Sequence, residues 1–366
     1  MTELQPSGTS TWPSSFMAGL HAALRRRIPP RADGPALEEL SRDLVLALEQ
    51  GELTVALTPE RLAAAQASGW LEGDASPLLL QGDRLGWRRW LQAMEQVVAE
   101  LVERAHAPLP KPVEAVDPEL SDRLNAEQCA AVRALDQASV VLLSGGPGTG
   151  KTSTVVEILA RAEARHPGLR IGLAAPTGKA ARRLGEAVMA QRAPLPCSTL
   201  HRWLEAGSRG FGRHRQRPLE LDLLVIDEMS MLDLALTQAL LEALPSGCRL
   251  LLVGDPAQLP PVGSGAVWHR LQQSDVRGRF GAGAVHLERT YRNRGALAQV
   301  AQQLRQGDLQ AFAADLAALP EQANLQVHPW PLRRFPALVR QRWIQRLQQL
   351  QALTVDLDRC TEQELM

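Results

Sequence analysis

The sequence predicts an α/β protein built around a parallel sheet with helices on both faces. Its central part alternates segments of helical spacing with short runs that are apolar almost throughout, namely SVVLLSG (139–145), IGLAA (171–175), LDLLVID (221–227) and RLLLVGD (249–255). Strands that are apolar on both sides must be covered on both sides. Right-handed crossovers between such strands bring their carboxyl ends to one edge of the sheet. We therefore expect the functional residues at that edge.

A smaller mixed region precedes this part. Leucines at 37, 40, 44 and 48 have the spacing of a one-faced helix that starts at Pro35, and residues 54–57 have the pattern of a short strand. Gln81-Gly82-Asp83 between two apolar runs predicts a hairpin, and residues 90–105 return to helical spacing. Four prolines within residues 107–120 indicate a linker. The expected boundaries are a flexible tail over 1–34, a first domain over 35–115, a central domain over 116–275 and a last region over 276–366.

Composition excludes several classes of protein. Forty basic residues balance forty acidic ones among 366, so net charge does not predict a nucleic-acid or membrane surface. No apolar run approaches the roughly 18 residues of a membrane span, and the first residues lack the apolar core of a secretion signal. The four cysteines contain no CxxC pair, which argues against a disulfide framework and a zinc site. We expect a cytoplasmic protein with no membrane partner.

The strongest motif follows the first of these strands. Residues 145–152 read GGPGTGKT and match GxxxxGK[ST] between a predicted strand and a predicted helix. Glycines let successive backbone N–H groups turn toward phosphate oxygens, and the helix adds its positive amino end. Lys151 is expected on the β- and γ-phosphates of ATP, and Thr152 on the Mg²⁺ that bridges them. The predicted nucleotide-binding residues of this loop are Gly145, Gly146, Pro147, Gly148, Thr149, Gly150, Lys151 and Thr152.

Acidic and amide side chains follow the later strands. Asp227 ends an apolar strand and is expected to hold Mg²⁺ through water, and Glu228 beside it is expected to orient or deprotonate the attacking water. Gln258, in a loop made stiff by three prolines, can donate to and accept from groups near a γ-phosphate. A base beside the metal favours hydrolysis over simple binding. Taken alone, the proline-rich loop is better interpreted as a structural turn.

Six segments together resemble the superfamily 1 DNA helicases, and among them most closely the RecD family, a helicase subunit of exodeoxyribonuclease V. They occur in the family's order, over roughly residues 120–310, with a fainter resemblance over 35–105. The segments are SGGPGTGKT (144–152), AAPTGKAARRL (174–184), STLHRWL (198–204), VIDEMSMLD (225–233), VGDPAQLPPVGSGAV (253–267) and LERTYRN (287–293). The resemblance implies a RecA-like P-loop domain, followed over 276–366 by an incomplete second RecA-like domain.

The resemblance also implies roles for residues that the physical argument does not reach. Gln128 would read the adenine base, and Arg292 would act on the γ-phosphate as an arginine finger from the second domain. Thr177, Lys179, Thr199 and His201 would hold the phosphates of single-stranded DNA. Without the family, Gln128 is interpreted as a solvated glutamine on a helix, His201 as a structural histidine and Arg292 as a surface cation.

The implied function is ATP-dependent 5′ to 3′ translocation on single-stranded DNA within a complex that contains RecB-like and RecC-like subunits and repairs double-strand breaks. Segments resembling TVHKSQG and YTAVTRA, which the family carries near its end, are missing from this sequence. Two alternatives therefore remain open. One is a stand-alone helicase of RecD type, and the other is a non-catalytic adapter that binds ATP and partner proteins without productive unwinding.

Overall fold

The computed structural model describes residues 14–109, 123–208 and 210–291, and, beyond them, residues 300, 303, 307, 309–318 and 344. The chain forms two compact units, Met1–Arg292 and Asn293–Met366. In the second unit the structure describes helix α13 (Leu309–Ala317) and little else. The expected partial second RecA-like domain therefore lies mostly outside the described residues. Within the described ranges, no helix combines the length and the apolar character needed to cross a bilayer.

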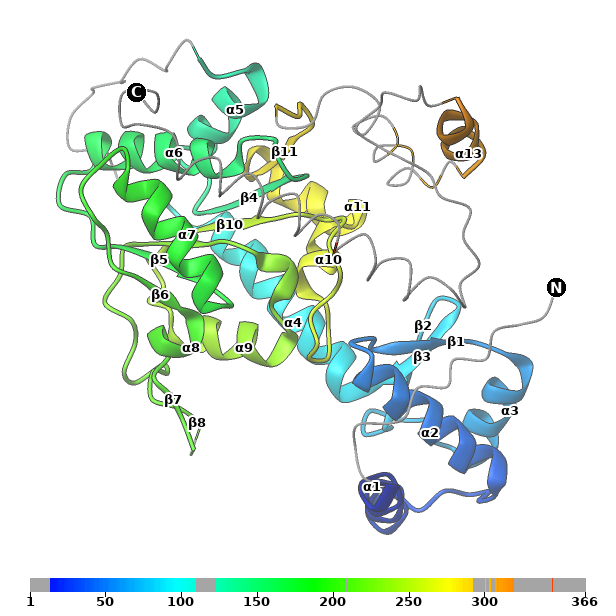
Figure 1. Ribbon diagram of the computed structural model, residues 1–366. Helices are drawn as coiled ribbons and strands as arrows, with labels where there is room; N and C mark the ends of the chain where they lie inside the picture. Colours follow the sequence, from blue (N-terminus) through cyan, green and yellow to red (C-terminus); the bar gives the residue numbers. More distant parts are fainter. Residues whose placement is uncertain are drawn as a thin grey trace. The chain divides into compact units, whose positions relative to one another are not determined.

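A six-stranded parallel sheet forms the centre of the first unit (Figure 1). The strand order is β11-β4-β10-β9-β5-β6, and each neighbouring pair is parallel. This confirms the predicted parallel sheet. The strands are β4 (Val140–Gly145), β5 (Ile171–Ala175), β6 (Cys197–Thr199), β9 (Leu223–Ile226), β10 (Arg249–Gly254) and β11 (Ala284–Leu287).

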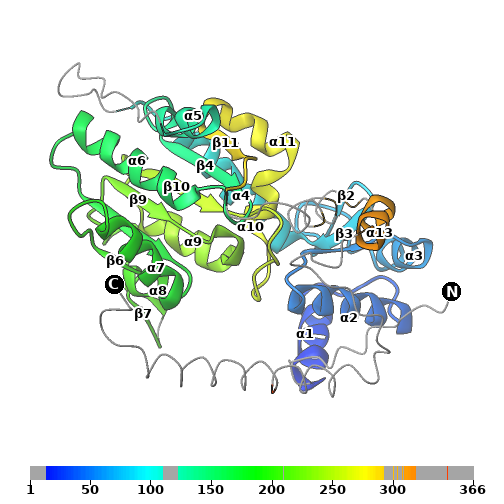
Figure 2. The ribbon, with the colours of Figure 1, turned by 45° about the horizontal axis from the view of Figure 1, so that its top comes forward.

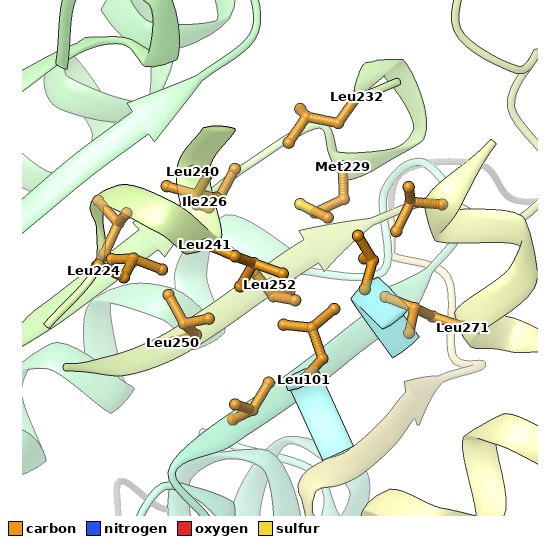
Figure 3. Close-up of a cluster of buried hydrophobic side chains, with 14 of the residues drawn as sticks. Leu101, Leu224, Ile226, Met229, Leu232, Leu240, Leu241, Leu250, Leu252 and Leu271 are labelled. Atoms are coloured by element: carbon orange, nitrogen blue, oxygen red, sulfur yellow. The ribbon is translucent and has the colours of Figure 1, made fainter. Parts of the chain in front are cut away.

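Helices cover both faces of this sheet (Figure 2). Successive residues of a strand point to opposite faces, so Leu142 packs in one hydrophobic cluster and Leu143 in the other. One face carries α5 (Ala126–Ala134), α6 (Lys151–Arg165) and α7 (Gly178–Met189). The opposite face carries α4 (Arg88–Ala105), α9 (Leu234–Ala243), α10 (Val267–Gln272) and α11 (Ser274–Arg277). Figure 3 shows the cluster on the face that α4 covers, in which Leu101 of α4 lies among leucines of the sheet.

The region before α4 is small and mixed, as predicted. An antiparallel sheet of order β1-β3-β2 joins β1 (Thr54–Ala56), β2 (Leu78–Gln81) and β3 (Arg84–Trp87). The pairing of Gln81 with Arg84 confirms the predicted hairpin. Beside the sheet lie α2 (Pro35–Glu49), which begins at the predicted residue, and α3 (Pro59–Ser68). The buried leucines of α2 pack against Trp70 and Trp87.

Described elements extend across three of the expected boundaries. The predicted flexible tail contains helix α1 (Ser14–Arg27), after which the Ile28 carbonyl accepts from Trp70 Nε1 at 3.0 Å. Helix α4 packs under the central sheet, not within a separate first domain that ends at 115. Strand β11 pairs with β4, so the central sheet continues beyond residue 275. In each case, a contact between residues far apart in the sequence decides to which part of the fold the segment belongs. Local composition does not reveal such contacts.

The remaining described elements are short and lie between these helices and strands. They are α8 (Leu200–Trp203), the hairpin β7 (Ala206–Gly207) and β8 (Gly210–Phe211), and the 3₁₀ turns η1 (Met229–Met231) and η2 (Gly278–Gly283).

Candidate functional site

The loop between β4 and α6 has the backbone that its glycines allow. Gly148 and Gly150 adopt φ of 79° and 86°, a conformation that side chains disfavour. A Cβ on Gly145 would lie 2.9 Å from the carbonyl oxygen of Leu287, so the loop also needs glycine for close approach to β11. Lys151 begins α6 and donates from Nζ to the carbonyls of Gly145 and Gly146, at 2.7 and 2.9 Å. The lysine ammonium thus lies on the loop itself, within reach of an anion bound there.

A cavity of about 970 Å³ opens beside this loop and collects most of the predicted site. The strands that supply it end level with one another, since Gly254 of β10 pairs with Ser144 of β4 and Leu252 pairs with Ile226 of β9. The predicted residues that line the cavity are Pro147, Gly148, Gly150, Lys151, Thr152, Thr177, Lys179, Asp227, Glu228 and Gln258. Groups from four parts of the sequence therefore face one space.

Asp227 and Glu228 form a strained turn at the end of β9. Glu228 has φ 57° and ψ 43°, the left-handed region that few residues other than glycine adopt, and its N–H donates to Asp227 Oδ1 at 2.9 Å. Burial raises the pKa of the Asp227 carboxyl, and the charge of Lys151 acts in the opposite direction. An ionised Asp227 lacks enough compensating charge in this structure, which is the environment that a bound cation relieves.

Gln258 has a partner that the sequence did not predict. Ser230, in turn η1, is fully buried, and its hydroxyl donates to Gln258 Oε1 at 2.9 Å. The serine lies within VIDEMSMLD, where the acidic pair is the more conspicuous signal. The hydrogen bond joins the turn after β9 to the loop after β10.

Gln128 lies under the loop instead of on the cavity wall. It is 5% exposed, and its side chain closes a capping box at the start of α5, where Oε1 accepts from Asn125 N at 3.0 Å. Its Nε2 donates to the Thr149 carbonyl at 3.5 Å. Both ends of the amide are therefore engaged within the protein, and the reading of adenine stays a prediction.

The residues expected on DNA divide into two groups. Thr177 caps the start of α7 by accepting from Ala180 N at 3.2 Å, and it lines the cavity with Lys179. Thr199 caps α8 by accepting from Arg202 N at 3.3 Å, and His201 is exposed one residue into that helix. Thr199 is the last residue of edge strand β6 and His201 follows it, and neither residue lines the cavity. Their contact with DNA stays a prediction.

Arg292 lies outside the described residues, but its neighbour is placed. Tyr291 N donates to the Gly148 carbonyl at 2.8 Å, and the Tyr291 hydroxyl accepts from Asn125 Nδ2 at 3.0 Å. The ring is 40% exposed on the cavity wall, beneath the guanidinium of Arg289. The prediction for this segment rested on its arginine, whereas the tyrosine, which was not predicted, brings the segment to the phosphate loop.

Residues 209–217 contain four arginines, and two of these, near the β7–β8 hairpin, are held in ion pairs. Arg213 Nε lies 2.8 Å from one Glu205 oxygen, and Arg217 contacts the other at 2.5 Å. Because Glu205 offsets part of the charge of these two arginines, the stretch offers less positive charge to a partner.

The donor set suits a magnesium ion that is shared with a ligand. Among the residues that the structure describes, no three His, Cys, Asp or Glu side chains gather to hold a metal on their own. Mg²⁺ typically keeps waters and takes one or two protein oxygens together with substrate phosphates. Thr152 and the half-buried Asp227 line the same cavity and supply such oxygens. The site therefore fits Mg²⁺ with a nucleotide and not a metal cage.

Comparisons with known proteins agree with this geometry. Residues 128–264 match the family model described as AAA domain. The chain is 37% identical over 304 residues to the RecBCD enzyme subunit RecD of Mycolicibacterium smegmatis, covering 77% of this chain and 53% of that protein. It is 41% identical over 191 residues to the ATP-dependent RecD2 DNA helicase of Deinococcus radiodurans, covering 52% of this chain and 25% of that protein.

A solved structure, that of the Pif1 helicase from Candida albicans, is 22% identical with a TM-score of 0.38, over 61% of this chain and 54% of that chain. The chain spans about half the length of its RecD relative from Mycolicibacterium smegmatis. The loop at 145–152 and the acidic turn at 227–228 both lie within residues 128–264, which match the family model. The chain is thus similar to RecD helicase subunits over much of its length, and its residues 128–264 match the AAA domain model.

Proposed function

We propose that this chain is the ATP-dependent 5′ to 3′ DNA helicase subunit of a RecBCD-type exodeoxyribonuclease V, acting in the cytoplasm on double-strand breaks. The observation that carries the proposal is the single cavity shared by Lys151, Thr152, Asp227, Glu228 and Gln258. This set supplies an anion cradle, oxygen ligands for a metal, a base and an amide. Together these groups are what hydrolysis of the β–γ anhydride bond requires.

Each group has a distinct task in that reaction. Lys151 would leave the carbonyls of Gly145 and Gly146 for the β- and γ-phosphates, which offer it full negative charge. Thr152 and Asp227 would hold Mg²⁺, which neutralises charge on the phosphates when bound. Glu228 would accept a proton from the attacking water. Gln258 would contact the γ-phosphate, and Arg292 would complete its charge stabilisation.

Coupling to DNA assigns the remaining predicted residues. Thr177 and Lys179 adjoin the nucleotide cavity and lie at the start of α7, and Thr199 and His201 lie at the start of α8. Both helix starts offer N–H groups and side chains to phosphates of single-stranded DNA. The names of the RecD relatives support RecB-like and RecC-like subunits as the protein partners.

The test is a DNA-stimulated ATPase assay on this chain, with Lys151→Ala as the matched control. We expect turnover that rises with single-stranded DNA, and a loss of about 10²-fold or more on Lys151→Ala, since a charged contact to the transition state is removed. A chain that retains ATP without stimulation by DNA supports the adapter alternative. Turnover that is insensitive to Lys151→Ala contradicts the proposal.

A further inference from the structure

The hydrogen bond between Ser230 and Gln258 carries an inference that rests on the proposed ATPase. Ser230 is fully buried, whereas Gln258 is exposed and lines the cavity. The serine hydroxyl donates to Gln258 Oε1 at 2.9 Å across 28 positions of sequence. A buried group therefore controls the orientation of an exposed one.

The orientation matters because a glutamine amide has two different ends. Oε1 accepts hydrogen bonds, and Nε2 donates two. Once Ser230 donates to Oε1, the end of Gln258 that remains for a ligand is the donor. Phosphate oxygens are acceptors, so this orientation suits a γ-phosphate, whereas the reversed amide would present an oxygen to an anion.

Three other buried hydroxyls behave differently. Ser41, Thr154 and Thr237 each donate to the backbone carbonyl four residues earlier in their own helix. Such bonds satisfy the hydroxyl locally, because a buried polar group without a partner is costly. Ser230 instead reaches a side chain on a separate loop. The hydroxyl of Ser230 is not needed to fill space, because an alanine would occupy most of the same volume.

The position of Ser230 also joins the two halves of the site. Ser230 is two residues after Glu228, in the turn where Met231 N donates to the Glu228 carbonyl at 3.0 Å. Gln258 belongs to the loop after the neighbouring strand β10. We propose that Ser230 is a positioning residue that holds Gln258 as a hydrogen-bond donor to the γ-phosphate and ties it to the Asp227–Glu228 turn.

The test compares Ser230→Ala, Gln258→Ala and the double variant in the 366-residue chain. Affinities for ADP and for a non-hydrolysable ATP analogue are measured by titration, and kcat and KM for ATP with single-stranded DNA. For Ser230→Ala we expect ADP affinity unchanged, and analogue affinity and kcat lowered about 3- to 10-fold, the range that one neutral hydrogen bond supports. The double variant is expected to match Gln258→Ala, because both changes remove the same contact.

Ser41→Ala provides the matched control, since Ser41 is also buried but its hydroxyl lies in α2. It should lower thermal stability slightly and leave the preference for the analogue over ADP unchanged. The role of Ser230 is overturned if Ser230→Ala weakens both nucleotides equally or if its effect adds to that of Gln258→Ala. A wild-type chain that binds no nucleotide overturns the proposed function itself, which is a different result.

Discussion

Asp227 shows how the site trades stability for a ligand. Its carboxyl lies half-buried directly after β9, and loss of solvent around it raises its pKa. A raised pKa means that the protonated form favours folding, so this contribution is present at low pH and is lost as pH rises through the folded-state pKa. At neutral pH the ionised carboxylate therefore destabilises the nucleotide-free protein.

Asp227→Asn tests this argument. The amide keeps the oxygen that accepts from Glu228 N and removes the buried charge. We expect a higher melting temperature than the wild type at pH 7.5, a difference that shrinks as pH falls toward 4, and loss of Mg²⁺-dependent ATP turnover. Thermal unfolding across this pH range is the measurement, with Glu228→Gln as the control at the neighbouring position. A melting temperature that falls at pH 7.5 would refute the destabilising role of the charge.

At the same scale, the sequence predicted residues whose place follows from strand ends. Lys151, Asp227 and Gln258 each come directly after an apolar strand or its loop, and parallel strands align their carboxyl ends. Ser230 and Tyr291 escaped prediction because their importance comes from contacts across 28 and 143 positions, to Gln258 and Gly148. Gln128 was predicted on the base, but the capping box that engages its amide depends on where α5 begins.

Among the elements, α7 offers the clearest separation of structure from function. Thr177 caps its amino end and also lines the cavity, so a single substitution changes both roles unless it is chosen with care. We expect Thr177→Ala to lower the free energy of unfolding by about 1 kcal/mol, the usual worth of such a cap. Thr177→Ser keeps the hydroxyl and should fold with near wild-type stability.

Urea unfolding gives the stability, and DNA-stimulated ATPase gives the function of the same two variants. If Thr177 contacts DNA through its hydroxyl, the serine variant retains stimulation and the alanine variant loses it beyond what its stability explains. Thr199→Ala, which removes the cap of α8, is the comparison away from the cavity. Equal stability of Thr177→Ala and the wild type would contradict the capping role.

Sequence patterns also predicted where helices and strands occur better than they predicted which sheet or region each one joins. Strand β4 and helix α6 were expected where they occur because the apolar run and the glycine motif are local signals. Strand β11 has only four residues, and its pairing with β4 is what adds it to the sheet. Helix α1 follows a stretch rich in serine and proline, which does not predict a helix. Its contact with the residues around Trp70 joins it to the rest of the small region.

Across the whole first unit, α4 joins the small sheet to the large one. Its first turn follows β3 directly, and its buried residues Val98 and Leu101 pack under the central sheet. The guanidinium of Arg104 donates to the Pro245 carbonyl at 2.9 Å, beyond the end of α9. A second contact is made by Ser264, whose hydroxyl donates to the Leu48 carbonyl at 2.8 Å. Helix α4 and these hydrogen bonds therefore connect the two regions, and we expect the regions to unfold together.

Removal of α4 should be far more harmful than removal of the residues before it. A chain that begins at residue 116, the sequence-based boundary, exposes the sheet face that Leu101 covers, and we expect it to be insoluble or to lack a cooperative transition. Leu101→Ala in the 366-residue chain should lower the free energy of unfolding by about 2 to 5 kcal/mol, because replacing a buried leucine with alanine leaves a cavity. Urea unfolding followed by fluorescence and by circular dichroism provides the measurement. Leu80→Ala, at a 41% exposed position of β2, is the control and should stay within about 1 kcal/mol of the wild type. A soluble, cooperatively folded chain from 116 would show that α4 is dispensable and that the sheet core is complete without it.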